Sequence, residues 1–103
     1  MLKTCIYYYS FMNDFMQLLL YVEEEHTQAA LECLERGFDD FYDEECAYCF
    51  GDCVEYRLSE LNIPYIIEYP EYDEEDGDPT DEWYEHVEEV TNSKTYNVVT
   101  QNY

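Results

Sequence analysis

The chain has 103 residues, and its 26 Asp and Glu against 4 Lys and Arg give a formal net charge of −22 and a pI near 4.1. At this charge, electrostatic repulsion opposes direct binding to nucleic acid or to an anionic membrane surface. The length suits one domain, and thirteen Tyr and one Trp supply the large apolar area that disordered chains lack. We therefore expect a single folded acidic domain over residues 1–103.

The N-terminal third contains two apolar runs of strand length, residues 5–9 and 17–22. Residues 12–14 between them offer a turn, so these runs predict a β-hairpin. A helix over residues 11–20 is the alternative, because Leu and Met also favour helix and short apolar runs do not decide by periodicity.

Two helices are predicted next. Thr27 can cap a helix that extends to about Tyr42, with Ala30, Leu34, Phe38 and Phe41 facing inward. Gly37 in its middle indicates close packing against a neighbour. A second helix fits residues 49–61, with an apolar stripe formed by Cys49, Cys53, Val54, Leu58 and Leu61. Asn62 ends this helix, and Pro64 prevents its continuation.

The C-terminal part begins with the clearest strand, Tyr65 to Tyr69, and a proline on each side of it suits an edge position or simply the ends of a strand. Residues 71–82 predict an extended acidic loop. Asp78 and Pro79 then read as the N-cap and first position of a helix that reaches about Val90. This helix would bury Trp83, Val87 and Val90, and residues 95–100 predict a final strand. The order of elements predicts an α+β fold, a small antiparallel or mixed sheet of three or four strands with two or three helices packed on one face.

Neither a membrane span nor a secretion signal is visible in the sequence. No run reaches the ~20 apolar residues that a membrane helix needs, and no apolar segment leads to a small-residue cleavage site. Five cysteines, an odd number, argue against a closed disulfide framework. We therefore expect a cytosolic protein.

Two segments resemble metal sites. Cys46, Cys49 and Cys53 have a metal-like spacing, but the same spacing places them on one helix face, which favours core cysteines over a zinc site. The acidic loop could bind calcium, yet placing Gly77 at the sixth position of an EF-hand loop puts Tyr72 at the first, where a carboxylate is required. We expect no cofactor, and a calcium-binding module is the less favoured alternative.

Catalytic motifs are missing from the sequence. There is no nucleophile elbow, no phosphate-binding glycine loop and no His-x-x-x-His pair, and His26 and His86 each lie among acids on predicted polar faces. Paired carboxylates are so frequent here that a pair carries no information about acid–base chemistry. The sequence therefore predicts a protein that is not an enzyme.

The charge itself is the main functional signal. A net charge of about 2–8 keeps a small domain soluble, and further like charge destabilises the compact state, so we infer that the surplus is kept for a basic partner. Carboxylates one helical turn apart lie about 6 Å apart along the axis and can bind Arg and Lys much as phosphates do. The candidate partner-binding residues are Asp39, Asp40, Asp43, Glu44, Glu45, Glu71, Tyr72, Asp73, Glu74, Glu75, Asp76, Asp78, Asp81, Glu82, Glu85, Glu88 and Glu89.

In size, composition and the alternation of Tyr with acids over residues 69–76, the chain resembles the DNA-mimic anti-restriction and anti-CRISPR inhibitors of phages and mobile elements. Members of this class have unrelated folds, so the resemblance implies no fold. It implies a role in viral counter-defence in the bacterial host cytoplasm, by blocking the DNA- or RNA-binding site of a CRISPR-Cas nuclease or restriction enzyme. In a Cas9-type target the basic surface would be the site whose Arg side chains read the PAM. The alternative is an acidic interaction or chaperone module for a basic nucleic-acid-binding protein.

Overall fold

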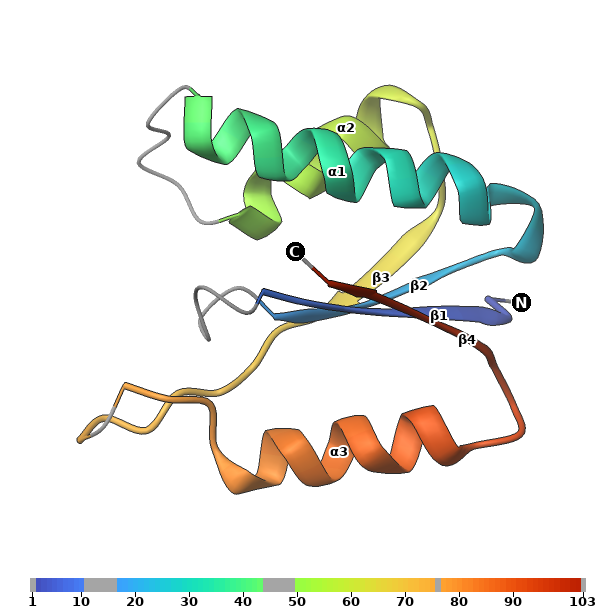
Figure 1. Ribbon diagram of the computed structural model, residues 1–103. Coiled ribbons are helices and arrows are strands. Elements are labelled where there is room, and N and C mark those ends of the chain that lie inside the picture. Colours follow the sequence, from blue (N-terminus) through green and yellow to red (C-terminus); the bar gives the residue numbers. More distant parts are fainter. Residues whose placement is uncertain (1, 11–16, 44–49, 76, 103) are drawn as a thin grey trace.

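The computed structural model describes residues 2–10, 17–43, 50–75 and 77–102, and it places a β-sheet between two helical layers (Figure 1). Helices α1 and α2 cover one face of the sheet, and α3 covers the other. The elements are β1 (Thr4–Tyr9), β2 (Leu18–Val22), a short 3₁₀ helix (Glu24–His26), α1 (Thr27–Asp43), α2 (Phe50–Glu60), β3 (Tyr65–Glu68), α3 (Asp81–Asn92) and β4 (Asn97–Asn102).

The sheet has four strands in the order β3-β2-β1-β4. The predicted hairpin pairing is confirmed, because β1 pairs antiparallel with β2, with Thr4 opposite Val22 and Tyr8 opposite Leu18. Strand β3 pairs antiparallel with β2 and occupies an edge position, as its flanking prolines allow. Strand β4 is parallel to β1 at the other edge, so the sheet is mixed. The alternative helix is wrong for Leu18–Leu20, which lie in β2; the predicted turn at 12–14 lies outside the described residues.

Each face of the sheet has its own apolar core. Alternate residues such as Ile6, Tyr8 and Leu20 pack with α1 and α2, and the residues between them, such as Cys5 and Leu19, pack with α3. Successive side chains of a strand point to opposite faces, so one apolar strand supplies both cores. The predicted α+β fold is confirmed, but the third helix lies on the opposite face from the other two. The continuous apolar run of β2, buried at all five positions, requires cover on both sides.

Helices α1 and α2 approach closely at the predicted glycine. A Cβ built on Gly37 would lie 2.8 Å from Cγ2 of Val54, closer than real Cβ contacts. Helix α2 ends at Glu60, and the chain turns at Asn62, the residue predicted to stop the helix: Asn62 has φ of 56°, and the amide of Ile63 donates to the carbonyl of Leu58 over 3.1 Å. The predicted inward position of Leu61 is wrong, because this side chain is 57% exposed and lies beyond the end of the helix.

The segment before α3 differs from the prediction. Thr80, and not Asp78, is the N-cap, and its hydroxyl accepts from the amide of Trp83 over 3.3 Å. Pro79 pairs with Tyr72 in an isolated antiparallel bridge, so the acidic segment folds back on itself instead of extending. The amide of Asp73 closes this turn on the carbonyl of Asp78 at 2.8 Å. The final strand begins two residues later than expected, at Asn97, and Trp83, Val87 and Val90 are buried as predicted.

Candidate acidic partner-binding surface

The outer face of α3 carries a row of carboxylates. Trp83, Val87 and Val90 face the sheet, which leaves the opposite side of the helix in solvent. The exposed acids of this row are Asp81, Glu82, Glu85, Glu88 and Glu89, all of them predicted from the sequence. Between the first and the last of them the helix rises about 12 Å, at 1.5 Å per residue.

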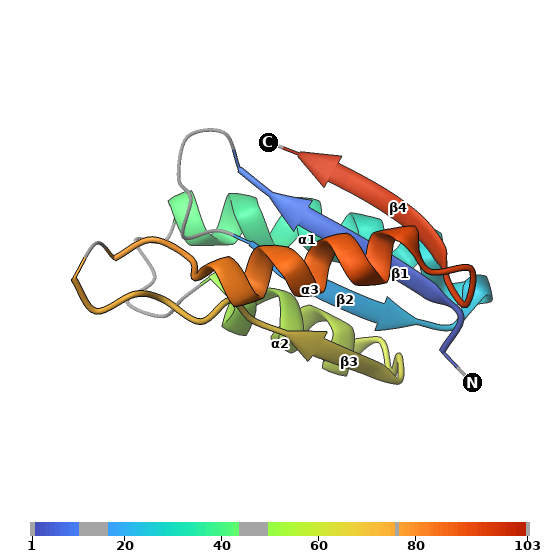
Figure 2. The ribbon, with the colours of Figure 1, turned by 90° about the horizontal axis from the view of Figure 1, so that it is seen from below.

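The turned-back acidic segment leads directly into this row. Its exposed residues are Glu71, Tyr72, Asp73, Glu74, Glu75 and Asp78, whereas Asp76 lies outside the described residues. Figure 2, seen from the α3 side, shows the segment projecting from the N-terminal end of α3. These six residues and the five exposed acids of α3 are called the α3 acidic surface below. No Lys or Arg occurs anywhere between residues 58 and 93, so its charge has no lysine or arginine nearby in sequence to offset it.

Two members of the second predicted row, Asp39 and Asp40, belong to α1 and therefore lie on the other face of the sheet (Figure 1). Asp39 is exposed, but Asp40 holds Arg57 of α2 with two hydrogen bonds, Nε to Oδ2 at 2.7 Å and Nη2 to Oδ1 at 3.0 Å. The guanidinium of Arg57 keeps the pKa of Asp40 below its usual range. The side chain of Asp43, and all of Glu44 and Glu45, lie outside the described residues. The structure thus separates Asp39 and Asp40 from the α3 acidic surface, and it uses Asp40 in an internal ion pair.

A three-residue chain of hydrogen bonds links the sheet to α3, and sequence reasoning missed it. The hydroxyl of Tyr21 donates to Glu68, and Nε2 of His86 lies 3.0 and 3.1 Å from the two Glu68 carboxylate oxygens. Burial alone would raise the pKa of Glu68, but these hydrogen bonds outweigh it, and the pKa is lowered. Burial, together with the neighbouring carboxylate, raises the pKa of Tyr21. The period-2 pattern of β3 places Glu68 on the same face as Ile66, and this pattern could have shown that the two side chains share one side of the sheet.

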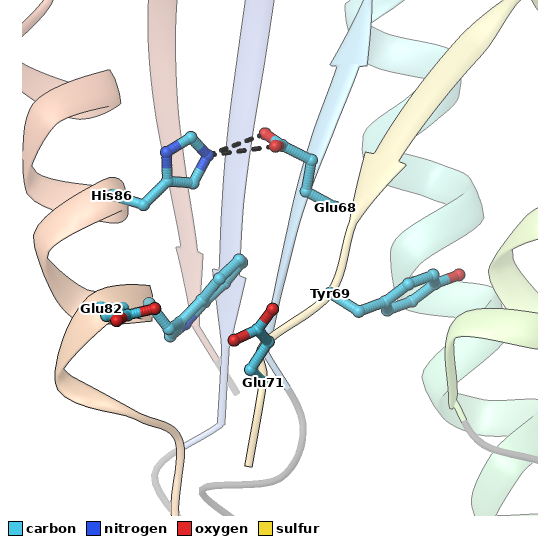
Figure 3. Close-up of a pocket in the computed structure, with 6 residues that line it drawn as sticks. Glu68, Tyr69, Glu71, Glu82 and His86 are labelled. Carbon is cyan, nitrogen blue, oxygen red and sulfur yellow. Dashed lines mark hydrogen bonds and ion pairs between the residues drawn. The ribbon is translucent and has the colours of Figure 1, made fainter.

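Beside Glu68 and His86 lies a pocket of about 260 Å³ between the end of β3 and the first turns of α3 (Figure 3). Its wall comprises Glu68, Tyr69, Glu71, Glu82, Trp83 and His86. In Figure 3, Glu68 and His86 face each other, while Tyr69 points away from them toward α2. The Tyr69 hydroxyl donates to Oε2 of Glu55 over 2.7 Å. The pocket is therefore bounded mainly by acids, an imidazole and an indole.

The indole of Trp83 is fixed from the sheet side. Its Nε1–H donates to Oε1 of Gln17 over 3.0 Å, and the same oxygen accepts from the hydroxyl of Tyr7 over 2.8 Å. Nε2 of Gln17 donates to the hydroxyl of Tyr84 over 3.1 Å. Gln17 and Trp83 are only 6% and 5% exposed, so these bonds hold α3 against the sheet away from water.

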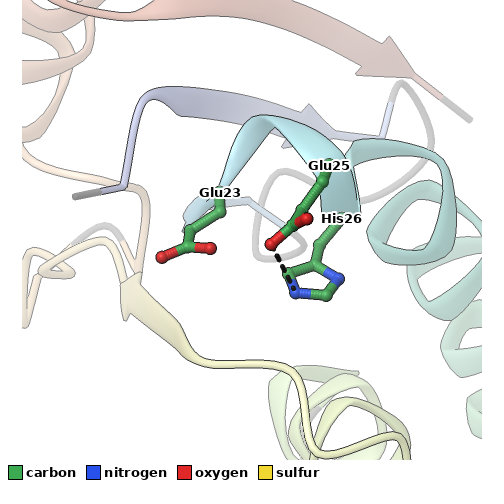
Figure 4. Close-up of side chains that lie close together, drawn as sticks. All are labelled: Glu23, Glu25 and His26. Carbon is green, nitrogen blue, oxygen red and sulfur yellow. Dashed lines mark ion pairs between the residues drawn. The ribbon is translucent and has the colours of Figure 1, made fainter.

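The three cysteines weighed above as a metal site are only partly described. Cys46 and Cys49 lie outside the described residues, and the buried Cys5 and Cys33 are packed in the two cores. Burial raises the pKa of the Cys5 thiol to about 11, which disfavours the thiolate that binds metals. Another cluster, Glu23, Glu25 and His26, brings three ligand atoms within 4.8 Å of one another around the 3₁₀ helix that precedes α1 (Figure 4). Exposed acids gather in this way without a metal, and nothing further marks the cluster as a site.

No family model, curated protein or solved structure matches this chain. Among the described residues, no helix combines the length and the apolar character needed to cross a membrane. Function therefore has to be argued from the chemistry of the surface.

Proposed function

We propose that this protein is a non-enzymatic inhibitor that mimics nucleic acid and blocks the DNA- or RNA-binding site of a CRISPR-Cas nuclease, of Cas9 type, or of a restriction enzyme. The observation that supports this most directly is the α3 acidic surface. It is a row of exposed carboxylates on a rigid helix, continued by an acidic turn, without a lysine or arginine between residues 58 and 93.

The charge spacing of α3 is similar to that of a nucleic-acid strand. Five acids between residues 81 and 89 span about 12 Å, which is about 3 Å of axis per charge. One strand of duplex DNA carries a charge every ~3.4 Å of axis. A basic cleft that binds a phosphate row can therefore pair with this helix, and carboxylates accept from Arg much as phosphates do.

Tyrosines on the same side of the molecule add contact area. Tyr72 and Tyr84 are 41% and 43% exposed, next to the acids of the turn and of α3. Exposed tyrosine rings bury area at low entropic cost and accept cations on their faces. A surface of acids with interleaved tyrosines suits a protein whose own site is lined with Arg and Lys.

The decisive experiment is displacement of DNA from its enzyme. We expect the protein to inhibit cleavage by a guide-loaded nuclease or a restriction enzyme and to compete with labelled DNA for it. The binding should weaken steeply between ~50 and 200 mM salt, as phosphate contacts do. Binding to a basic nucleic-acid-binding protein without displacing its DNA would refute mimicry and favour the acidic chaperone module.

Matched variants identify the face that binds. The α3 triple E85Q/E88Q/E89Q and the α1 triple E32Q/E35Q/D39N each remove three exposed charges and leave the buried cores unchanged. We expect the α3 triple to lose most of the inhibition and the α1 triple to retain it. The opposite ranking would refute the assignment of the binding face to α3. Equal small losses of inhibition in the two variants would refute binding through one defined acidic face.

A further inference from the structure

The pocket beside the Glu68–His86 pair contains carboxylates that the fold does not use. Glu71 and Glu82 line it, both residues are exposed, and within the described residues neither carboxylate has a hydrogen-bond or ion-pair partner. Glu68 is already bonded to Tyr21 and His86. Two unpaired negative charges therefore face one small cavity, which favours a cationic occupant.

The size of the cavity limits what that occupant can be. At about 260 Å³ it is smaller than the ~300–1,000 Å³ of pockets that enclose drug-sized ligands. A nucleotide or a cofactor would not fit, whereas the end of one long side chain would. A helix or strand of a partner that presents such a side chain can meet the pocket, because it opens at the surface between β3 and α3 (Figure 3).

The two carboxylates distinguish between the two cationic side chains. Trp83 also lines the pocket, but at 5% exposure it offers little surface for stacking, and its Nε1–H bond to Gln17 keeps it fixed when a ligand enters. A guanidinium is planar and donates to two carboxylates at once, whereas an ammonium is a compact, strongly hydrated charge. Arginine therefore fits this combination of groups better than lysine.

We propose that this pocket, called the arginine pocket below, receives one arginine side chain of the basic partner, whose guanidinium lies between Glu71 and Glu82 against Trp83. This inference rests on the proposed function, since it specifies how part of the α3 acidic surface engages its target. It makes one position of the mimic selective for arginine, where a row of exposed carboxylates alone would accept any cation.

A neighbouring recess supports a protein partner for this position. It has a volume of about 340 Å³, shares Glu68 and His86 with the arginine pocket, and is otherwise lined by Leu2, Tyr21, Ile66, Val90 and Tyr96. Ile66 is 56% exposed there, on edge strand β3. A charged pocket beside an apolar recess has the layout of a protein–protein contact, in which an arginine anchor lies next to packed apolar area.

The single tryptophan gives a direct test, because it is the one indole of the chain and it lines the pocket. The probes are two tripeptides blocked at both ends, acetyl-Gly-Arg-Gly-amide and acetyl-Gly-Lys-Gly-amide, titrated into the whole protein at low salt. We expect a saturable change in Trp83 fluorescence with the arginine peptide, and at least fivefold weaker binding of the lysine peptide.

Two double variants supply the matched comparison. E71Q/E82Q removes the two pocket carboxylates, and E88Q/E89Q removes the same charge from the far part of α3, where neither residue lines the pocket. We expect E71Q/E82Q to weaken the arginine peptide about tenfold and E88Q/E89Q less than twofold. Equal weakening by the two variants, equal affinity for the two peptides, or no response of Trp83 would each overturn the arginine pocket.

The same proteins in the DNA-displacement assay separate this inference from the proposed function. If wild type displaces DNA but fails the peptide test, the arginine pocket is wrong and mimicry stands. If the peptide test succeeds while wild type displaces DNA from no nuclease, mimicry is wrong and the pocket stands as a site for arginine in another partner.

Discussion

Gln17 is the residue whose replacement should most clearly loosen α3 from the sheet. Gln17→Met keeps the length of the side chain and removes the oxygen that accepts from Trp83 and Tyr7. The indole N–H is then buried without a partner, which costs about 1–3 kcal/mol, and the hydroxyl of Tyr7 loses a bond of about 1 kcal/mol. Tyr84, 43% exposed, can turn to water at little cost. We expect a total loss of about 2–3 kcal/mol, or roughly 10–20 °C in Tm for a domain of this size.

Urea unfolding followed by Trp83 fluorescence and by far-UV circular dichroism measures this loss. Tyr7→Phe is the matched control, because it removes one donor and leaves the Trp83 bond to Gln17 intact, so it should cost about 1 kcal/mol. If Gln17→Met costs no more than Tyr7→Phe, or stays within ~0.5 kcal/mol of wild type, the indole bond does not hold α3 and the reasoning fails.

Other perturbations test the packing and the ion pairs. Gly37→Ala should lower Tm although alanine favours helix by about 1 kcal/mol, because its Cβ would press on Val54 and overpacking costs about 1–3 kcal/mol; a higher Tm would contradict the close approach. Asp40→Asn should cost about 0.5–1 kcal/mol at neutral pH through the lost bidentate pair with Arg57, measured by urea unfolding. Since the pKa of Asp40 is lowered in the fold, its contribution is present above the ordinary carboxyl pKa and is lost as pH falls through the folded value, so variant and wild type should converge in acid. The pKa of Glu68 is lowered too, so Glu68→Gln should destabilise at neutral pH. Its effect should fade as pH drops from the ordinary carboxyl pKa of 4.5 through the lower folded value, and a penalty of equal size in strong acid would show that shape, not charge, is responsible. Moderate salt should raise the Tm of wild type by screening the net charge of −22 over about 8 Å, and a flat response would mean that the acids do not crowd one another.

Local patterns were enough to predict most of the elements. The spacing of Trp83, Val87 and Val90 correctly predicted the buried side of α3 and hence its exposed acids, because that pattern depends on one helix alone. Gly37 correctly indicated a close helix contact. The N-cap was misplaced because Asp78-Pro79 is a strong local signal, whereas Pro79 is instead held by its bridge to Tyr72 across the turn.

Contacts between distant segments could not be read in this way. Asp40 looked like a free surface acid, and its pairing with Arg57 depends on how α1 packs against α2. The link between Tyr21, Glu68 and His86 joins β2, β3 and α3, and neither the order of the strands nor the sheet face covered by α3 was predicted correctly. The face covered by α3 did have a signal, since β2 is apolar at consecutive positions, but the sequence reasoning did not use it.

The two outer strands have a consequence for how copies of this molecule meet. Among the described residues, β3 and β4 each pair with a strand on one side only, so both margins of the sheet present backbone groups to which another chain could add. These edge strands need no segment to cover them if copies of the protein, which carry like charge, repel one another before their edges touch. Concentrated salt weakens that repulsion, so we expect the protein to self-associate through its edge strands at high salt.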